Sequence, residues 1–398
     1  MLHKFKQQIV TNVTIKIFRV KTFIYSAKRK YFILILKKFD RFREKYGDNM
    51  FRKISEGIDK GLLIPRPLLK NVLKTVGPLS FIVANHPESV IQNISSYKLR
   101  LRKHRLPWAH IDDESRYDST KILSKKILDN IGQLRHENKK YLRPTLFCES
   151  DAPEIRALAE QLRSESKSDE EFAQAAFKWV KNNKYLIFKP IGGALKTFKT
   201  KGGVCLDQLS LLAAIARAGG IPSRYRLYGL VPTQEMYDIM VAPDPILRET
   251  LQSLGFLDAM HGEAELKVNG KWVNGDPTFS DELSVGMGVG ISEFGAEPGW
   301  RIRVDKSMDI RFEGFPLLFR QFTLPLFIVL RKTVDNVNDS MDQIREKGRE
   351  ILEEISIEEY NKKMKRKHIK PVLPSVDEVK EFRKRAIDRP KPTVSEID

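Results

Sequence analysis

The chain has 398 residues and a formal net charge of +19, and 41% of its residues are hydrophobic. This length suggests two or three domains, and the composition is that of a globular protein with charged appendages. The only two cysteines, Cys148 and Cys205, lie far apart in the sequence, which excludes a disulfide framework and suits the reducing cytoplasm.

Residues 1–50 are predicted to be a basic amphipathic N-terminal arm, with 13 Lys and Arg against three Asp and Glu and hence a net charge of +10. Such an arm attracts an anionic membrane surface or nucleic acid, although a solvated basic helix face has the same pattern. Its longest apolar run, Tyr31 to Leu36, is too short for a secretory signal or a membrane span. We expect a cytoplasmic protein, peripheral to a membrane if the arm binds lipid.

Residues 51–140 are predicted to be a mixed helical N-terminal region. The apolar segment Pro78–Asn85 within it resembles a strand. Nothing in this region has the spacing of a catalytic motif.

Two amphipathic helices open the region 141–290, which we predict to be a single domain. The first begins near Ser150–Pro153, where a capping residue precedes a proline of the first turn. The second begins at Ser168, which is expected to form a capping box with Glu171. Their apolar residues recur at helical spacing and are therefore core positions without assigned chemistry.

The next helix is predicted to start at Cys205. Apolar residues from Leu206 to Ala216 form one helical face, and Gly219-Gly220 marks the end of the helix. A helix N-terminus carries a partial positive charge and free N–H groups. It therefore stabilises a thiolate, and it offers the N–H of Cys205 to a developing oxyanion.

Three lysines that precede this helix, Lys196, Lys199 and Lys201, are expected to act in the same direction as the helix N-terminus. Gly202 and Gly203 allow close approach of a substrate. The alternative interpretation of Cys205 is a buried structural cysteine.

The segment from His261 to Asp276 predicts a β-hairpin, because Asn269-Gly270 lies between two alternating runs. A two-residue turn places Val268 opposite Lys271. One face of the hairpin is then expected to carry Ala264, Leu266, Val268 and Val273, and the other His261, Glu263, Glu265, Trp272, Asn274 and Asp276.

In this register Asp276 is a diagonal neighbour of His261, at about 7–8 Å between Cα atoms. A carboxylate there fixes the imidazole tautomer and stabilises the imidazolium, and the opposite ring nitrogen can address a thiol. Two other interpretations stay open. His261 and Asp276 could be plain surface residues, or His261, Glu263 and Glu265 could bind a metal, although a second His or a Cys pair is missing.

Residues 291–330 are expected to be an apolar segment that packs on the core, since prolines and Arg320 interrupt the run Phe315–Leu330. Residues 331–398 are predicted to form a charged helix followed by a disordered tail. Apolar residues within 334–355 recur at a three-four spacing, which favours either self-association through a short coiled coil or packing on the chain's own domain.

Together these segments resemble the transglutaminase-like superfamily, the papain-like group that includes transglutaminases, peptide N-glycanases and many prokaryotic cysteine proteases. The resemblance begins with the two helices and continues through the Gly203–Asp207 turn, which is similar to the family's G-x-C nucleophile turn. The exit Ala218–Arg224 and the segment from His261 to Asp276-Pro277-Thr278 are similar to the family's strand, hairpin and Asp-Pro-Thr.

This resemblance implies an α+β fold with a papain-like transglutaminase core. A helix carrying Cys205 would pack on an antiparallel sheet carrying His261 and Asp276, with helical N- and C-terminal extensions. Cys205 would be the nucleophile, His261 the base and Asp276 the residue that orients it. No metal or organic cofactor is implied.

The implied reaction is acyl transfer on an amide bond of a protein or peptide substrate, through a thioester. Hydrolysis of a peptide or isopeptide bond is expected first, and transamidation second. The alternative is a catalytically degenerate binding or scaffold module that uses the basic arm. The family often has Trp two residues after the His, whereas this chain has Glu263, which would point to solvent, hold a Lys or bias His261 toward its charged form.

Overall fold

The computed structural model describes part of the chain in detail. The described residues are 80, 82–92, 118–124, 127, 139–231, 233–254, 259–298, 300, 302–303, 309–316, 320, 324 and 327–364. The basic arm of residues 1–50 and the tail beyond residue 364 lie outside them. Binding of the arm to a membrane or to nucleic acid therefore stays a prediction.

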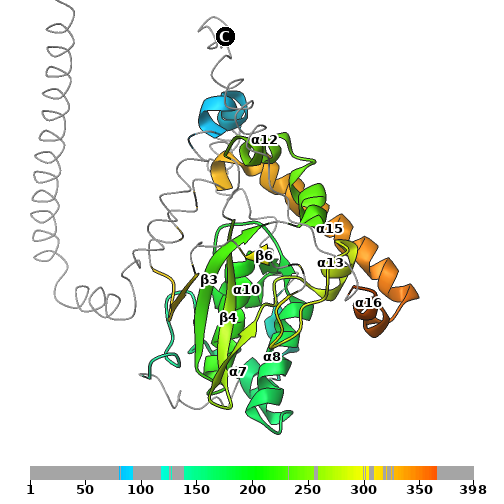
Figure 1. Ribbon diagram of the computed structural model, residues 1–398. Coiled ribbons are helices and arrows are strands. Elements are labelled where there is room, and N and C mark those ends of the chain that lie inside the picture. The colour runs from blue at the N-terminus through cyan, green and yellow to red at the C-terminus, as the bar shows by residue number, and fades with distance from the viewer. Residues whose placement is uncertain are drawn as a thin grey trace, which may run out of the picture. The chain divides into compact units, whose positions relative to one another are not determined.

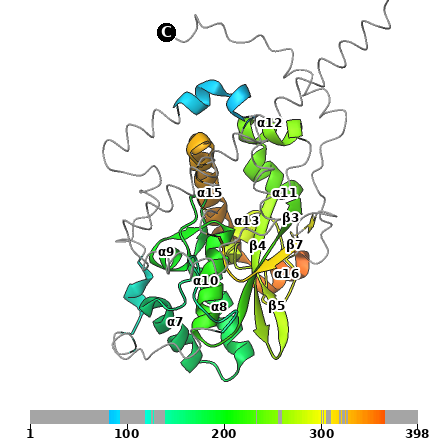
Figure 2. The ribbon, with the colours of Figure 1, turned by 90° about the vertical axis from the view of Figure 1, so that its left-hand side faces the viewer.

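A layer of helices covers one face of an antiparallel sheet (Figures 1 and 2). The central helix is α10, whose residues from Leu206 to Arg217 are all buried. The helices of this layer are α7 (Pro153–Ser164), α8 (Asp169–Asn183), α9 (Ala194–Lys199) and α10 (Cys205–Ala218).

The starts of α7 and α8 follow the sequence signals in part. Pro153 is the first residue of α7, as expected, but the N-cap is Ala152, which makes no side-chain cap. At α8 the Ser168 hydroxyl accepts a bond of 3.1 Å from the Glu171 N–H. The Glu171 carboxylate accepts from Lys167 rather than from Ser168. The expected capping box is therefore only half formed.

The main sheet has the order β5-β4-β3, and both β6 and β7 pair with the far edge of β3. The predicted hairpin is confirmed, since Val268 pairs with Lys271 and Leu266 with Val273. Its strands are β3 (Ser223–Val231), β4 (Ala259–Val268), β5 (Lys271–Gly275), β6 (Ile302–Arg303) and β7 (Asp309–Phe312). The segment 291–330 thus packs on the core partly as two strands of the sheet.

The contact between α10 and β4 depends on a glycine beside His261. A Cβ atom on Gly262 would lie 2.5 Å from Leu209 and 2.6 Å from Leu206, both on α10. Any larger side chain would push the helix away from the strand. Gly262 therefore lets the helix that begins at Cys205 lie directly on the strand that carries His261.

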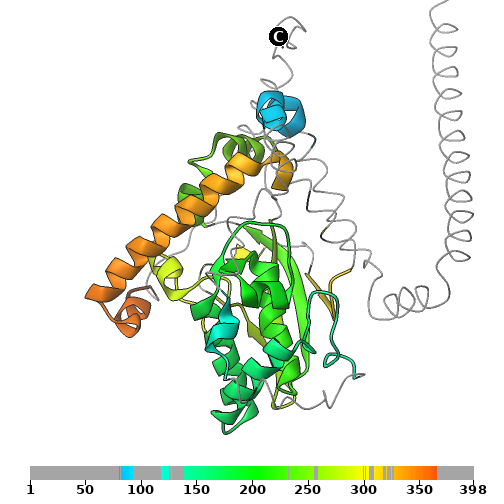
Figure 3. The same cartoon turned by 180° about the vertical axis from the view of Figure 1, so that it is seen from behind.

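A second group of helices packs beside the sheet (Figure 3). The longest, α15, contacts α13 and η3, and its residues Val337, Met341 and Ile344 are buried in a second apolar cluster. The group comprises α11 (Gln234–Met236), η3 (Tyr237–Val241), α12 (Pro245–Leu254), α13 (Asp281–Gly286), α15 (Arg331–Glu354) and α16 (Ile357–Met364). The apolar stripe of α15 is thus used within the chain, and self-association through residues 334–355 stays a prediction.

The prediction of a strand at Pro78–Asn85 is wrong. Residues 82–85 and 87–92 are helical. Ile82 and Val90 are buried in one cluster with Leu330, and their separation of eight residues suits one face of a helix. Short apolar runs are ambiguous between strand and helix, and a long-range contact decides here. Among the described helices, none is both long and apolar enough to cross a membrane.

We predict that Gly348→Ala destabilises the fold although Ala is the better helix former. A Cβ on Gly348 would lie 1.8 Å from the Glu282 carbonyl oxygen, so α13 and α15 would have to separate. The free energy of unfolding should fall by about 1–3 kcal/mol, as measured by urea titration. The control Lys347→Ala, at an exposed position of the same helix, should change it by less than about 0.5 kcal/mol.

Candidate active site

The fold places Cys205 at the N-terminus of α10, as predicted. Its side chain is partly exposed, and the preceding Gly202–Gly203 form β2, which pairs with β1 (Tyr185–Leu186). The N–H of Val204 donates to Asp207 at 3.3 Å, which caps the helix from its own first turn. The thiol therefore lies at a helix start that is buried on one side and open on the other.

Asp207 also holds the loop beside Cys205. Its other carboxylate oxygen accepts bonds of 2.9 and 3.1 Å from the N–H groups of Gly192 and Gly193. Glu149 accepts from the N–H of Ala194 at 2.8 Å. Burial raises the pKa of Asp207 to about 6 and that of Glu149 to about 7, against the hydrogen bonds, which lower both values. Two carboxyl groups with pKa values near neutral pH thus hold the loop beside Cys205.

The raised pKa of Glu149 predicts how Glu149→Gln changes stability. The folded-state pKa lies above the ordinary 4.5, so the ionised carboxylate costs stability above pH 7, and this cost vanishes below pH 4.5. Glutamine keeps an acceptor for the same N–H groups without the charge. The variant should be more stable than the wild type by about 1–3 kcal/mol at pH 8 and equal to it at pH 4.5, as measured by urea unfolding. An equal effect at both pH values would contradict this.

The ring of His261 lies against Asp276, with 2.8 Å between Nε2 and Oδ2. The expected His–Asp contact is therefore confirmed. The thiol of Cys205 also lies close enough to the ring to raise the pKa of His261. Since Nε2 contacts Asp276, Nδ1 is the ring nitrogen that is left to address the thiol. The structure brings the three predicted residues together in the order thiol, imidazole and carboxylate.

The electrostatics of the site favour the imidazolium. Burial alone would lower the pKa of His261, but the charge and hydrogen bond of Asp276, followed by the bond with Cys205, raise it to about 10. At neutral pH His261 therefore carries a proton.

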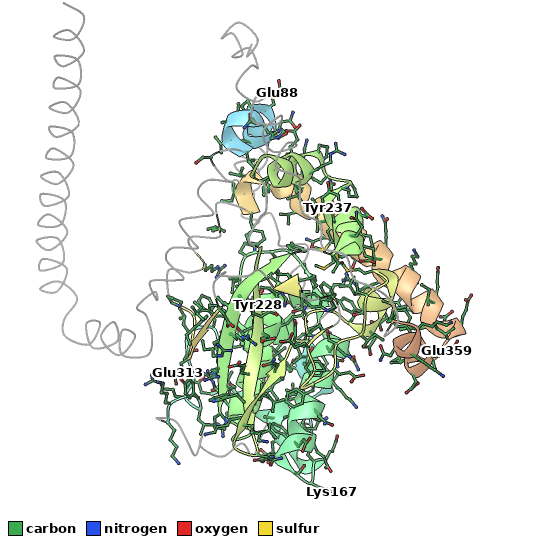
Figure 4. All side chains as sticks on the ribbon, viewed as in Figure 1. Glu88, Lys167, Tyr228, Tyr237, Glu313 and Glu359 are labelled. Atoms are coloured by element: carbon green, nitrogen blue, oxygen red, sulfur yellow. The ribbon has the colours of Figure 1, made fainter. Side chains whose placement is uncertain are left out.

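Two aromatic rings enclose His261. Tyr228, labelled on β3 in Figure 4, pairs with His261 across the strands, and the two ring centroids lie 5.6 Å apart. Trp300 lies at 5.2 Å from the imidazole with an interplanar angle of 87°, and Phe279 stacks on Trp300. T-shaped contacts of this kind are favourable. They restrict the ring and keep water from its bond with Asp276.

Glu263 does not face Asp276, because β5 ends at Gly275 and Asp276 turns away from the ladder. It does not reach solvent either, since it is fully buried and Arg226 lies 2.9 Å away. Arg226 also donates hydrogen bonds of 2.9 and 2.8 Å to Asp309. The expectation of solvent exposure is therefore wrong, and the charged partner that β3 supplies at this register is an arginine.

The metal interpretation of the same face is not supported. Glu265 is engaged by Arg224 and Arg311, and Glu263 by Arg226. In the part of the chain that the structure describes, no three His, Cys, Asp or Glu side chains are grouped so that they could hold a metal.

The lysines before α10 are used differently from the prediction. Lys199 forms an ion pair with Glu154 at 2.8 Å, and Lys201 with Asp342 at 3.2 Å. Carboxylates from other helices thus offset two of the three charges. The positive charge near the Cys205 thiol therefore comes chiefly from the helix terminus and His261.

Sequence reasoning missed several residues around the site. Asp207 had a local signal, since it lies three residues after the N-cap. Tyr228 could have been found only by pairing β3 with β4, and Trp300 had no signal, because a loop brings it to His261. Arg226 could likewise have been found only by pairing β3 with β4.

A thiol at a helix start beside a sheet-borne His–Asp pair is the arrangement typical of papain-like cysteine enzymes. Residues 156–277 match the model of the transglutaminase-like superfamily, a range that ends one residue beyond Asp276. This part of the chain is therefore similar to the transglutaminase-like superfamily, in agreement with the resemblance and the α+β fold expected from the sequence.

One solved structure is similar to the chain, a candidate cysteine protease from Cytophaga hutchinsonii. The identity is 22%, the match covers 42% of this chain and 48% of that one, and the TM-score is 0.27. The chain thus spans about half of the length of this relative. No curated protein matches the chain.

Proposed function

We propose that the protein is a cysteine-dependent amide hydrolase, which cleaves a peptide or isopeptide bond through a thioester on Cys205. The observation that carries this proposal is the position of His261, whose ring lies 2.8 Å from Asp276 and close enough to Cys205 for the thiol to raise the pKa of the imidazole. A plain surface histidine would need neither contact.

In the first step the Cys205 thiolate attacks the carbonyl carbon, and a tetrahedral oxyanion forms. The N–H of Cys205 at the start of α10 is placed to donate to this oxygen. The C–N bond then breaks, and the His261 imidazolium gives its proton to the leaving amine. The products of this step are a thioester, a free amine and a neutral imidazole.

In the second step water attacks the thioester. Neutral His261 takes a proton from the water, and Asp276 stabilises the imidazolium that forms again. The C–S bond breaks, the carboxylic acid leaves, and the thiolate–imidazolium pair is restored. An amine in place of water would give transamidation. We favour water because it needs no second binding site.

The test is alkylation of Cys205 by iodoacetamide across pH 5–9, followed by intact-protein mass spectrometry. Cys148 is fully buried and serves as an internal unreactive thiol. A thiolate–imidazolium pair should react at pH 6 at least about ten times faster than an ordinary thiol, which is mostly protonated there. His261→Ala should lose this advantage.

Labelling like that of an ordinary thiol in both proteins would leave a degenerate binding or scaffold module as the better description. Incubation of the protein with a cell extract supplies the second measurement. An acyl adduct on Cys205 that is absent from Cys205→Ala supports the thioester, and the mass of the adduct identifies the acyl group.

A further inference from the structure

A glutamine on the nucleophile's helix connects it to the turn that carries Asp276. Gln208 lies one helical turn after Cys205 and is completely buried. Its amide nitrogen donates to the carbonyl oxygen of Thr278 at 3.2 Å. This bond joins two segments that are 70 residues apart in sequence.

The same turn holds the carboxylate. The N–H of Thr278 donates to Oδ1 of Asp276 at 3.2 Å, and Oδ2 of Asp276 bonds His261 at 2.8 Å. Cys205 lies near enough to the ring of His261 to raise the pKa of the imidazole. Gln208 is therefore linked through the 276–278 turn and His261 back to Cys205 at the start of the same helix.

Packing alone does not explain why a glutamine occupies this buried position, because burying its amide costs free energy. Among the described residues, its amide oxygen has no hydrogen-bond partner, and neither does the hydroxyl of Thr278. A buried polar atom without a partner costs about 1–3 kcal/mol. A Leu or Met at this helix position would fill the space without that cost. Local features that lower stability are found where function requires them.

We infer that Gln208 is a positioning residue, which sets the distance between the sulfur of Cys205 and the ring of His261 by fixing the 276–278 turn on α10. This inference rests on the proposed function. Gly275, just before the turn, lies close to α10, since a Cβ atom there would be 2.9 Å from the Leu212 side chain, but such an apolar approach gives no directional hold on the turn. An error of about 1 Å in such a geometry lowers a rate by about a hundred-fold.

The first test is Gln208→Met, which keeps the length of the side chain and removes the hydrogen bond. The alkylation rate of Cys205 by iodoacetamide at pH 6 should fall at least about ten-fold. Ser210→Ala is the matched control. Ser210 is equally buried on the same helix and bonds Leu206 and Tyr225, away from the turn, so its rate should stay within about two-fold of the wild type.

The second test is Gln208→Glu, which separates positioning from a merely structural role within one protein. A protonated carboxyl can donate to the Thr278 carbonyl, whereas a carboxylate repels it. Burial raises the pKa of such a group. The variant should therefore react like the wild type at pH 5 and at least about ten times more slowly at pH 8. This comparison does not depend on the stability of Gln208→Met.

The outcomes separate the two proposals. If the wild type and His261→Ala react alike at pH 6, the proposed function fails. If His261→Ala is slow but Gln208→Met matches Ser210→Ala, or if Gln208→Glu follows the wild-type pH profile, only the role of Gln208 is overturned.

Discussion

Asp276→Asn is expected to slow the alkylation of Cys205 at pH 6 by about a hundred-fold. The carboxylate of Asp276 is the chief group that raises the pKa of His261, whereas burial lowers it. Asparagine keeps the shape but not the charge, so the effect of burial would dominate and the imidazolium would be lost near neutral pH. A hundred-fold loss corresponds to a His261 pKa that falls about two units below the assay pH of 6, since each unit is a factor of ten.

The same variant should change the pH dependence of stability. The folded-state pKa of His261 is about 10, above the ordinary 6.5. Its contribution to stability is therefore fully present below pH 6.5 and is lost as the pH rises through about 10. Asp276→Asn should be less stable than the wild type at pH 6, and the difference should shrink by pH 10. Urea titrations at these two values measure it.

Asp339→Asn, at an exposed position of α15, is the control for both measurements and should behave as the wild type. Alkylation of Asp276→Asn at the wild-type rate would show that the carboxylate does not govern the charge of His261. A stability loss that is equal at pH 6 and pH 10 would point to packing rather than to titration.

Arg226→Met is expected to lower the free energy of unfolding by about 3–5 kcal/mol. The substitution removes the guanidinium that lies 2.9 Å from the buried Glu263. Without this counter-charge the buried carboxylate loses the compensation that Arg226 gives for its desolvation. Chemical denaturation at pH 7 measures the loss. Arg226 also lies 5.5 Å from the ring of Tyr228, so the packing of that ring on His261 should loosen as well.

The double variant Arg226→Met/Glu263→Met tests whether the penalty is electrostatic. Replacement of both partners of a buried ion pair by apolar residues is often neutral or stabilising. The double variant should therefore recover most of the stability that Arg226→Met loses. If it is as unstable as the single variant, the role of Arg226 lies in its bonds to Asp309 instead.

The short-range parts of the candidate site followed from the sequence. The apolar face from Leu206 to Ala216 and the glycines Gly219-Gly220 predicted the course and end of α10, and Asn269-Gly270 fixed the hairpin register and hence the diagonal from His261 to Asp276. These features depend on backbone preferences over a few residues and on the alternation of side chains along a strand. Such preferences are local and can be read without the rest of the chain.

The surroundings of His261 were decided only by the tertiary structure. Arg226 meets Glu263 because β3 lies beside β4, Trp300 arrives from a loop, and Gln208 meets Thr278 across 70 residues. The apolar stripe of α15 was visible in the sequence, but its partner, α13, was not. Periodicity shows that a residue will be buried, whereas the identity of its neighbour depends on which distant segments pack together, and that is a property of the whole fold.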